Sequence, residues 1–431
     1  MNKRFKSKIQ YSKLLTWCKL LKHFLSLYYH SSNSMTIKRQ IFYILLFTFT
    51  TTLFVQNTDE SKVGTYVLPE LLKAQNGKEV NSTEKWNTIR HPEILRLFED
   101  NVYGQVPKDF DKIEYKVLEQ NKKALNGKAT YKKLAIYVIR NKKIITILTD
   151  LFIPNNVKKP VPTFVTINHR GGETMNASPE NEFWPAEKVI NSGYAIAGFD
   201  VKDVAPDHKT NYVNQILTKL YPEQMTQLNG MRALGAWGWG VSRIIDYFET
   251  DKAIDAKKTI VVGHSRGGKA ALWCGAQDER IAITISNESG NSGAKISRRN
   301  FGETVEVITR NFPHWFVPKY AEYANNEHNL PIDQHMLLAL MAPRAVYVAS
   351  AADDSWADPK GQYLALVAAQ PVFELFNFKP NLPDNMPPNN EQVIQLPLGF
   401  HNRDGVHNMN LFDWKQFIKF ADEYFKKKNN K

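Results

Sequence analysis

One short stretch, residues 259–273, constrains the fold of this chain more than any other. The β-branched apolar run Thr259–Val262 predicts a buried strand, and the helix-forming run Lys269–Trp273 follows the turn Gly263-His-Ser265-Arg-Gly267. A strand, a G-x-S-x-G turn and a helix in this order form a nucleophile elbow, whose glycines permit a sharp bend that lifts the serine above the sheet. The alternative is an ordinary strand–helix turn with a capping serine. The flanking patterns favour Ser265 as a nucleophile that faces the positive end of the helix dipole.

Strand and helix patterns alternate along most of the chain. Strands are predicted at 113–118, 131–140, 143–153, 160–169, 193–199, 259–262, 280–285, 344–350 and 392–397, and helices at 91–99, 229–249, 360–373 and 411–427. Asn141-Lys142 predicts a tight hairpin between antiparallel strands, whereas helices separate the later strands, as in a parallel sheet. We therefore expect an α/β-hydrolase fold, a three-layer sandwich with a mostly parallel central sheet. Four glycines within 229–249 predict that the elbow helix or its strand packs closely there.

A serine nucleophile needs a base and an acid, which follow it along the chain in this fold. Of the five histidines after Ser265, only His401 and His407 lie after the last predicted strand. His407, which precedes the closing helix, is the preferred base, and His401 a structural or pocket-lining residue. Glu288 follows the strand after the elbow, and Asp353-Asp354 follow the next strand. Both strands end at the same edge of the sheet, so a carboxylate from either place could reach His407. The choice of acid stays open.

The oxyanion of the reaction needs donors aimed at the developing charge. The backbone N–H of Arg266 is the expected first donor, and the loop His169–Gly172 lies where hydrolases place a second one. The Arg266 side chain, next to the nucleophile, could add a charged donor. Its alternative role is a surface salt bridge.

The N-terminal 57 residues differ from the rest of the chain. The 15-residue apolar stretch Ile41–Val55 follows Lys38-Arg39 and precedes polar residues, and it is shorter than a membrane span of about 20 residues. These features predict a signal peptide at 35–57, an over-extended N-terminus at 1–34, and a single catalytic domain at 58–431. The alternative is a basic extension with an uncleaved anchor. The signal peptide predicts a secreted or periplasmic protein that is not stably inserted in a membrane, and because no cysteine directly follows the apolar stretch, we do not expect a lipoprotein.

Charge and cysteine content narrow the function classes. Residues 1–57 hold nine Lys and Arg and no acid, so only +4 of the net charge of +13 belongs to residues 58–431, which argues against a nucleic-acid binder. Of the two cysteines, Cys18 and Cys274, the mature chain would keep one, so no disulfide can form within it. A chain of this size with 43% hydrophobic residues can build its own core. We expect a monomeric enzyme without metal or cofactor.

Several motifs together indicate a family. Gly-His-Ser265-Arg266-Gly-Gly-Lys269 resembles the G-x-S-R-x-G-K signature of the glucuronoyl esterases, carbohydrate esterase family 15. The resemblance covers residues 85–427, looks like the bacterial branch, and extends to Gly235-Ala-Trp237-Gly-Trp239-Gly, Asn287-Glu288-Ser-Gly, Ser297-Arg-Arg-Asn-Phe-Gly-Glu303, Asp354-Ser-Trp356-Ala-Asp-Pro-Lys-Gly361 and Gly405-Val-His407. It implies the α/β-hydrolase fold and serine-based ester hydrolysis.

The resemblance also implies roles for single residues. Ser265 would be the nucleophile, Arg266 the oxyanion donor and His407 the base. Glu288 would be the usual acid, and Asp354 occupies the second acid position seen in bacterial members. Because both acid positions are filled in this chain, the resemblance does not decide between them.

Three further residues match positions that contact the glucuronoyl ring, namely Lys269, Glu303 and Trp356. An aromatic face can cover the C–H groups of a sugar while charged side chains bind its hydroxyls. The alternatives are that Trp356 is loop core, that Glu303 pairs with Arg298 or Arg299, and that Lys269 is a solvated helix start.

The implied activity is hydrolysis of esters of (4-O-methyl-)glucuronic acid, which cross-link glucuronoxylan to lignin alcohols in plant biomass. An acetyl or feruloyl xylan esterase, or a general carboxylesterase of the same fold, is the first alternative. A carbohydrate-binding pseudoenzyme that keeps the pocket without turnover is the second.

Overall fold

The structure is a computed structural model that describes residues 56–429. The predicted over-extended N-terminus and nearly all of the predicted signal peptide therefore lie outside the described residues. Residues Asn57–Lys431 form one compact unit. Within the described residues, every helix is too short or too polar to cross a membrane.

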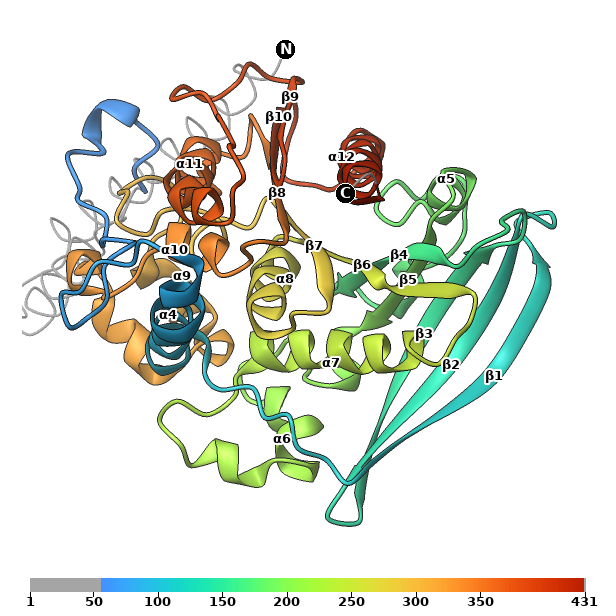
Figure 1. Cartoon of the computed structure of the whole chain (residues 1–431). Coiled ribbons are helices and arrows are strands. Elements are labelled where there is room, and N and C mark those ends of the chain that lie inside the picture. Colours follow the sequence, from blue (N-terminus) through green and yellow to red (C-terminus); the bar gives the residue numbers. More distant parts are fainter. Residues whose placement is uncertain (1–55, 430–431) are drawn as a thin grey trace, which may run out of the picture. The chain divides into compact units, whose positions relative to one another are not determined.

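A ten-stranded sheet forms the middle layer, in the order β1-β2-β3-β5-β4-β6-β7-β8-β10-β9 (Figure 1). Neighbouring strands from β5 to β10 run parallel, whereas the pairs that involve β1, β2, β3 and β9 are antiparallel. The strands are β1 (Lys112–Ala124), β2 (Ala129–Arg140), β3 (Lys143–Pro154), β4 (Val161–Asn168), β5 (Ala195–Asp200), β6 (Ile254–His264), β7 (Ile281–Asn287), β8 (Ala345–Ala351), β9 (Gln392–Gln395) and β10 (Leu398–Arg403).

Helices cover both faces of this sheet, which confirms the predicted three-layer α/β-hydrolase fold (Figure 1). On one face, α5 (Ala186–Asn191) and α12 (Leu411–Asn429) bury apolar side chains such as Trp414. On the other face, α7 (Ala233–Phe248) and α8 (Arg266–Gln277) bury a core that includes Trp273. The remaining α-helices are α3 (Thr83–Lys85), α4 (His91–Phe98), α6 (Ile216–Lys219), α9 (Val305–Asn311), α10 (Gln334–Ala339) and α11 (Pro359–Leu375).

Two local predictions are confirmed by backbone geometry. Asn141 and Lys142 join β2 to β3 with φ of 51° and 60°, as a two-residue hairpin turn of type I′ requires. Helix α7 lies against the elbow helix α8, because a Cβ at Gly238 would stand 3.0 Å from the Cβ of Cys274. A side chain at 238 would therefore crowd α8, and Cys274 is a small buried packing residue.

The end of the sheet differs from the prediction. The predicted strand at 392–397 is the short antiparallel strand β9, and a further strand, β10, follows it and pairs with β8. His401 therefore lies inside a strand instead of in a loop after the last one. The sequence did not predict β10 because polar residues interrupt its apolar pattern. One of them, His401, is buried in the sheet, where it forms hydrogen bonds with Tyr347 and Asp413.

Candidate active site

The predicted elbow forms at the carboxyl end of β6. Ser265 has φ 56° and ψ −125°, a conformation that side-chain-bearing residues rarely adopt, and its N–H donates to the carbonyl of Asn287 at 2.8 Å. A Cβ at Gly263 would lie 2.0 Å from the carbonyl oxygen of Gly267, so the bend excludes any side chain there. The strained turn holds Ser265 between the sheet edge and the N-terminus of α8.

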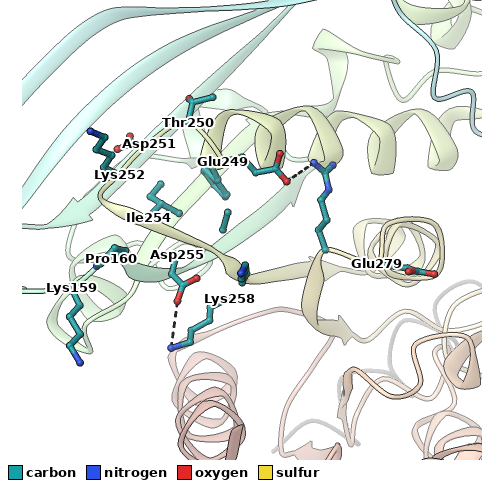
Figure 2. Close-up of a pocket in the computed structure, with 14 residues that line it drawn as sticks. Lys159, Pro160, Glu249, Thr250, Asp251, Lys252, Ile254, Asp255, Lys258 and Glu279 are labelled. Atoms are coloured by element: carbon teal, nitrogen blue, oxygen red, sulfur yellow. Dashed lines mark hydrogen bonds and ion pairs between the residues drawn. The ribbon is translucent and has the colours of Figure 1, made fainter. Parts of the chain in front are cut away.

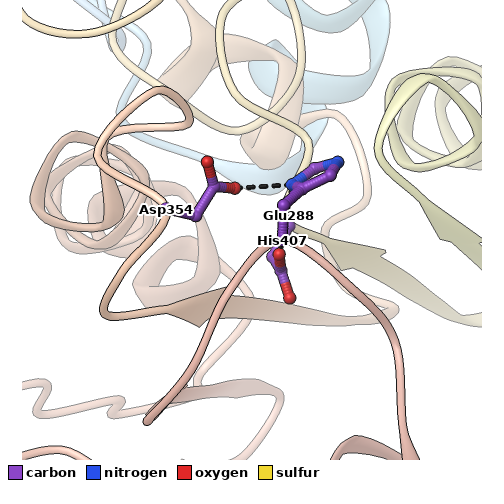
Figure 3. Close-up of side chains that lie close together, drawn as sticks. All are labelled: Glu288, Asp354 and His407. Atoms are coloured by element: carbon purple, nitrogen blue, oxygen red, sulfur yellow. Dashed lines mark hydrogen bonds and ion pairs between the residues drawn. The ribbon is translucent and has the colours of Figure 1, made fainter. Parts of the chain in front are cut away.

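Two carboxylates approach one nitrogen of His407 (Figure 3). The Nδ1 of His407 donates to Oδ2 of Asp354 at 2.6 Å, and Oε2 of Glu288 lies 3.1 Å from the same nitrogen. The three residues come from the loops after β10, β8 and β7, whose ends meet at one edge of the sheet. The imidazole is 40% exposed while both carboxylates are buried. The two carboxylates thus orient His407 from its buried side.

The charges around His407 alter its acidity and that of Glu288. Burial alone would lower the pKa of His407, but the hydrogen bonds and negative charges of Asp354 and Glu288 raise it to about 9. Burial raises the pKa of Glu288 to about 7, against the opposing effects of His407 and Arg403. The two carboxylates therefore stabilise the protonated, positively charged form of His407.

A buried arginine compensates the charge of Glu288. Arg403, on β10, donates from Nη2 to Oε1 of Glu288 at 2.7 Å and from Nε to Oδ2 of Asp413 at 3.0 Å. Asp413 in turn accepts from Nε2 of His401 at 2.9 Å, and Tyr347 contacts the other nitrogen of that ring. Because this network lies in the core, Arg403 holds Glu288 in place through Oε1, and Oε2 faces His407 and the N–H of Asn408.

The same three residues, Glu288, Asp354 and His407, have ligand types that could bind a metal, with ligand atoms within 4.8 Å of one another. Their spacing argues for a hydrogen bond instead. Tetrahedral ligands at zinc distances stand about 3.4 Å apart, whereas Nδ1 of His407 lies 2.6 Å from Asp354. A charge-assisted hydrogen bond accounts for that distance.

His407 lies beside the elbow. Its ring centre is 4.5 Å from that of His264, the residue that precedes Ser265. His264 is buried, its Nδ1 lies 2.6 Å from Oδ1 of Asn287, and burial holds its pKa well below the usual value. Within residues 56–429 the Ser265 hydroxyl makes no hydrogen bond. Catalytic hydrogen bonds of this kind often tighten only when substrate is bound.

Comparison with known proteins identifies the family. The family model "Glucuronyl esterase, fungi" matches residues 136–377. The carbohydrate esterase MZ0003, from an unknown prokaryotic organism, is 36% identical over 399 residues, which are 85% of this chain and 92% of the relative. The chain belongs to the glucuronoyl esterases. The solved glucuronoyl esterase from Solibacter usitatus matches with a TM-score of 0.80 and 37% identity, over 85% of this chain and 100% of that one.

A second solved structure, a promiscuous CE15 esterase from a marine bacterial metagenome, matches with a TM-score of 0.79 and 36% identity over 86% of this chain and all of that chain. These relatives confirm both the predicted family, carbohydrate esterase family 15, and its bacterial type. As a member of this family, the chain is a carboxylic ester hydrolase.

The three predicted sugar-contacting residues of this glucuronoyl esterase lie together. Nζ of Lys269 is buried and donates to Oε2 of Glu303 at 2.8 Å and to the carbonyls of Ser289 and Asn291. Nε1 of Trp356 donates to Oε1 of Glu303 at 3.2 Å, while the indole remains 46% exposed. The three alternative roles are therefore wrong: Lys269 is not solvated, Glu303 pairs with Lys269, and Trp356 is not loop core.

Arg266 forms a salt bridge, which was the alternative role predicted for it. The pair with Asp207 is partly buried instead of lying at the surface. Its Nη1 donates to Oδ2 of Asp207 at 2.6 Å, and its guanidinium lies over the rings of Phe312 and Trp315. In the loop predicted to supply a second oxyanion donor, burial lowers the pKa of His169 to about 3. The imidazole of His169 is therefore neutral beside the elbow.

Sequence reasoning missed Arg403 and Asp207. Arg403 lies in the unpredicted strand β10, whose six residues are all buried although three of them are polar, so no apolar run or alternation in the sequence reveals it. Asp207 belongs to a loop with two other aspartates, and nothing in the local pattern separates it from them. Both residues reach the site through contacts distant in sequence.

A wide cleft of about 1240 Å³ lies at the opposite edge of the sheet (Figure 2). Ile254, which lines it, pairs with Val161 of β4, whereas Gly263 of the elbow pairs with Ile167, six residues further along β4 and so roughly 20 Å away at about 3.3 Å per residue. Charged groups in the cleft pair with one another, as Asp255 does with Lys258. This cleft is no part of the active site.

Proposed function

We propose that this chain hydrolyses esters of glucuronic acid, including its 4-O-methyl form, with Ser265 as nucleophile and His407 as base. The observation that carries the proposal is the arrangement of His407, which two buried carboxylates orient and which packs against His264, the residue before the strained Ser265. The names of the relatives support the substrate. One curated relative, from Phanerochaete chrysosporium, is called 4-O-methyl-glucuronoyl methylesterase 1 and is 30% identical over 318 residues.

The first step is acylation. In the neutral form of His407, Nδ1 keeps the proton that it donates to Asp354, so Nε2 is free of a proton and can accept one. Nε2 takes the proton of Ser265 Oγ as this oxygen attacks the C6 carbonyl carbon of the uronate ester. The carbonyl oxygen gains a negative charge, which the Arg266 backbone N–H and guanidinium stabilise. The tetrahedral intermediate then expels the alcohol, which receives the proton from His407.

The second step is hydrolysis of the glucuronoyl-enzyme. His407 removes a proton from water, and the resulting hydroxide attacks the ester carbon bound to Ser265. The C–O bond to Ser265 breaks, and the serine oxygen regains its proton from His407. The products are the free glucuronate and the regenerated enzyme, so no cofactor or metal takes part in the proposed cycle.

Asp354 is the working acid in this proposal. Its oxygen lies 2.6 Å from Nδ1 of His407, whereas that of Glu288 lies 3.1 Å away. Glu288 also accepts from Arg403 at 2.7 Å and from the N–H of Asn408 at 3.0 Å. These donors offset much of its negative charge, so Glu288 attracts the proton on His407 less strongly than Asp354 does. Glu288 serves mainly to hold the loop that carries His407.

Recognition of the sugar is assigned to Lys269, Glu303 and Trp356. The exposed face of Trp356 offers an apolar surface for the C–H groups of a pyranose ring. The carboxylate of Glu303, oriented by Lys269 and Trp356, would accept hydrogen bonds from sugar hydroxyls. Lys269 thereby fixes Glu303 while its positive charge favours an anionic product.

The proposed biological substrate is the ester that joins 4-O-methyl-glucuronic acid on xylan to a lignin alcohol. We propose that a signal peptide at residues 35–57 exports the enzyme to the periplasm or the medium, where such polymers occur, and that it acts as a monomer. Binding of nucleic acid plays no part in this function.

The test compares hydrolysis of benzyl glucuronate with that of acetyl and feruloyl esters. We expect benzyl glucuronate to have the highest kcat/KM. A clear preference for acetyl or feruloyl esters would make this chain one of the alternative xylan esterases. Ser265→Ala should abolish turnover and still bind the glucuronate product, measured by calorimetry. Binding of glucuronate by the wild-type protein without turnover of any ester would indicate a pseudoenzyme.

A further inference from the structure

Asp207 connects three side chains beside the elbow. It follows the short helix η5 (Val201–Asp203) in a loop that is distant in sequence from Ser265. Its Oδ1 accepts from Nε2 of His314 at 2.9 Å and from Nε1 of Trp315 at 2.7 Å. Its Oδ2 accepts from Nη1 of Arg266 at 2.6 Å. Each carboxylate oxygen is therefore used, and Asp207 cannot turn without breaking at least one of these bonds.

The guanidinium of Arg266 is also confined by aromatic rings. Its central carbon lies 4.8 Å from the ring centre of Trp315 and 5.0 Å from that of Phe312. These two rings stack on each other at 4.0 Å and are nearly parallel, and Trp315 is buried. Because Trp315 also donates to Asp207, one indole touches both partners of the ion pair. Arg266 therefore has little rotamer freedom.

One buried donor of Arg266 is left without an acceptor in the part of the chain that the structure describes. Nη1 is occupied by Asp207, whereas Nε is buried and has no hydrogen-bond partner among residues 56–429. A buried charged N–H without an acceptor is unfavourable unless a ligand supplies one. In a residue that directly follows the nucleophile, such a group is suited to a negative oxygen that exists only during the reaction.

We propose that Asp207 is a positioning residue that holds the Arg266 guanidinium ready for the oxyanion. Asp207 acts through Arg266 and touches no reacting atom. The proposal rests on the esterase function proposed above and goes beyond it, because it assigns a catalytic purpose to the loop between β5 and α7. His314 and Trp315 complete the arrangement by fixing the orientation of Asp207.

The ion pair persists over the pH range in which an esterase works. Burial alone would raise the pKa of Asp207, but hydrogen bonds from His314 and Trp315 and the charge of Arg266 hold it well below its usual range. Loss of the carboxylate would leave the guanidinium charged and free to adopt other rotamers. Since the oxyanion forms only in the transition state, kcat should fall and KM should change little.

The experiment is a double-mutant cycle with Asp207→Asn and Arg266→Ala on benzyl glucuronate. Loss of an oxyanion donor lowers kcat by about 10²- to 10³-fold, and we expect Asp207→Asn alone to lower kcat by about 10- to 100-fold with KM within about twofold. In the Arg266→Ala background, Asp207→Asn should cause no further loss, because Asp207 acts only through Arg266. Asp207→Glu, which keeps the charge but moves it, should also lower kcat.

Asp246→Asn is the matched control. Asp246 also pairs with arginines, and its side chain is 16% exposed, as is that of Asp207. It lies on α7 and lines no part of the site, so kcat should not change. Circular dichroism and thermal melts of all variants report folding. If Asp207→Asn does not fold, the cycle is run with Asp207→Glu.

Two results would overturn the proposal. One is full kcat in a folded Asp207→Asn or Asp207→Glu variant. The other is an equal fold-loss from the Asp207 substitution with and without Arg266, which would indicate a purely structural effect. Failure of the proposed function is distinguishable, because in that case the wild-type enzyme itself would not hydrolyse benzyl glucuronate.

Discussion

At the scale of single residues, two carboxylates contact His407, and they differ in their distance from Nδ1 and in their other partners. Asp354 is the nearer of the two to Nδ1, and Glu288 is engaged on its other side by Arg403. A carboxylate whose charge is already matched by an arginine stabilises an imidazolium less than one without such a partner. We therefore propose different tasks for the two acids, catalysis for Asp354 and loop positioning for Glu288.

The two acid substitutions should separate these tasks. We expect Asp354→Asn to lower kcat by on the order of 10³- to 10⁴-fold, as in other serine hydrolases whose triad acid becomes an amide, and Glu288→Gln to lower it by a smaller factor. Glu288→Gln should lower the free energy of unfolding by about 1–3 kcal/mol, because Arg403 loses a buried charged partner. Steady-state kinetics and urea denaturation measure the two effects. The opposite ranking of kcat would make Glu288 the triad acid.

The pH dependence of kcat/KM offers an independent check. His407 must be neutral to accept a proton, so kcat/KM should rise with pH through its pKa, which the two carboxylates raise to about 9. Asp354→Asn removes one negative charge, which lowers this pKa, so the rise should move to lower pH while the maximum falls. Asp353→Asn, at the adjacent exposed position, serves as control and should keep the wild-type profile. If the pH profile of Asp354→Asn does not move, Asp354 does not set the pKa of His407.

At the scale of secondary-structure elements, the elbow depends on backbone atoms that nearly touch. A methyl group at residue 263 would stand 2.0 Å from the carbonyl oxygen of Gly267, which is backbone and cannot turn aside. We predict that Gly263→Ala moves Ser265 and lowers kcat by at least about 100-fold, since small misplacements cost that much. In Gly172→Ala the added methyl meets nothing closer than 3.7 Å, so this variant should remain active. Equal activity of the two variants would contradict the steric account.

A second element reaches the site from the beginning of the described chain. Asn57 accepts from the N–H of Gly302 through its carbonyl at 2.8 Å, and Glu60, at the start of the helix η1 (Glu60–Lys62), pairs with Arg299 and Lys360. Residue 302 adjoins Glu303, whose N–H donates to the carbonyl of Trp356. The segment Glu60–Lys62 therefore supports the loop assigned to sugar binding through the ion pairs of Glu60.

Removal of this support should affect binding more than turnover. We expect Glu60→Ala to raise KM for benzyl glucuronate by less than about fivefold, since a half-exposed ion pair contributes at most about 1 kcal/mol, and to leave kcat unchanged. Glu70→Ala removes a comparable exposed pair, with Lys73, that lies away from the site, and it should change neither constant. A Glu60→Ala enzyme with normal KM would show that the loop keeps its position without the segment.

At the scale of the whole molecule, the compact unit begins at Asn57. A protein that starts at Asn57 should therefore melt cooperatively and keep the full kcat/KM on benzyl glucuronate. It should also bind DNA no more tightly than a neutral protein at low salt, because only +4 of the net charge of +13 lies in residues 58–431. Calorimetry and fluorescence anisotropy measure these properties. Salt-sensitive, micromolar DNA binding by the shortened protein would contradict this expectation.

Prediction from the sequence succeeded where a local pattern has a local cause. The elbow, the hairpin at Asn141-Lys142 and the order of most strands and helices depend on neighbouring residues. It failed at β10, where buried polar side chains interrupt the apolar pattern of a strand. It also left Lys269 open to interpretation, because a lysine in the first turn of a helix is ordinarily solvated, and only Glu303 and two backbone carbonyls explain its burial.

The sequence by itself determined the family, the fold and the position of the strained serine, because motifs spaced along the chain and the alternation of strands and helices are properties of the chain order. Only the tertiary structure decided that both carboxylates meet His407 while Arg403 compensates one of them, and that Asp207 restrains Arg266. The physical reason is that hydrogen bonds and charge interactions act over a few ångströms in space. Residues more than 50 positions apart reach such distances only after the sheet has formed.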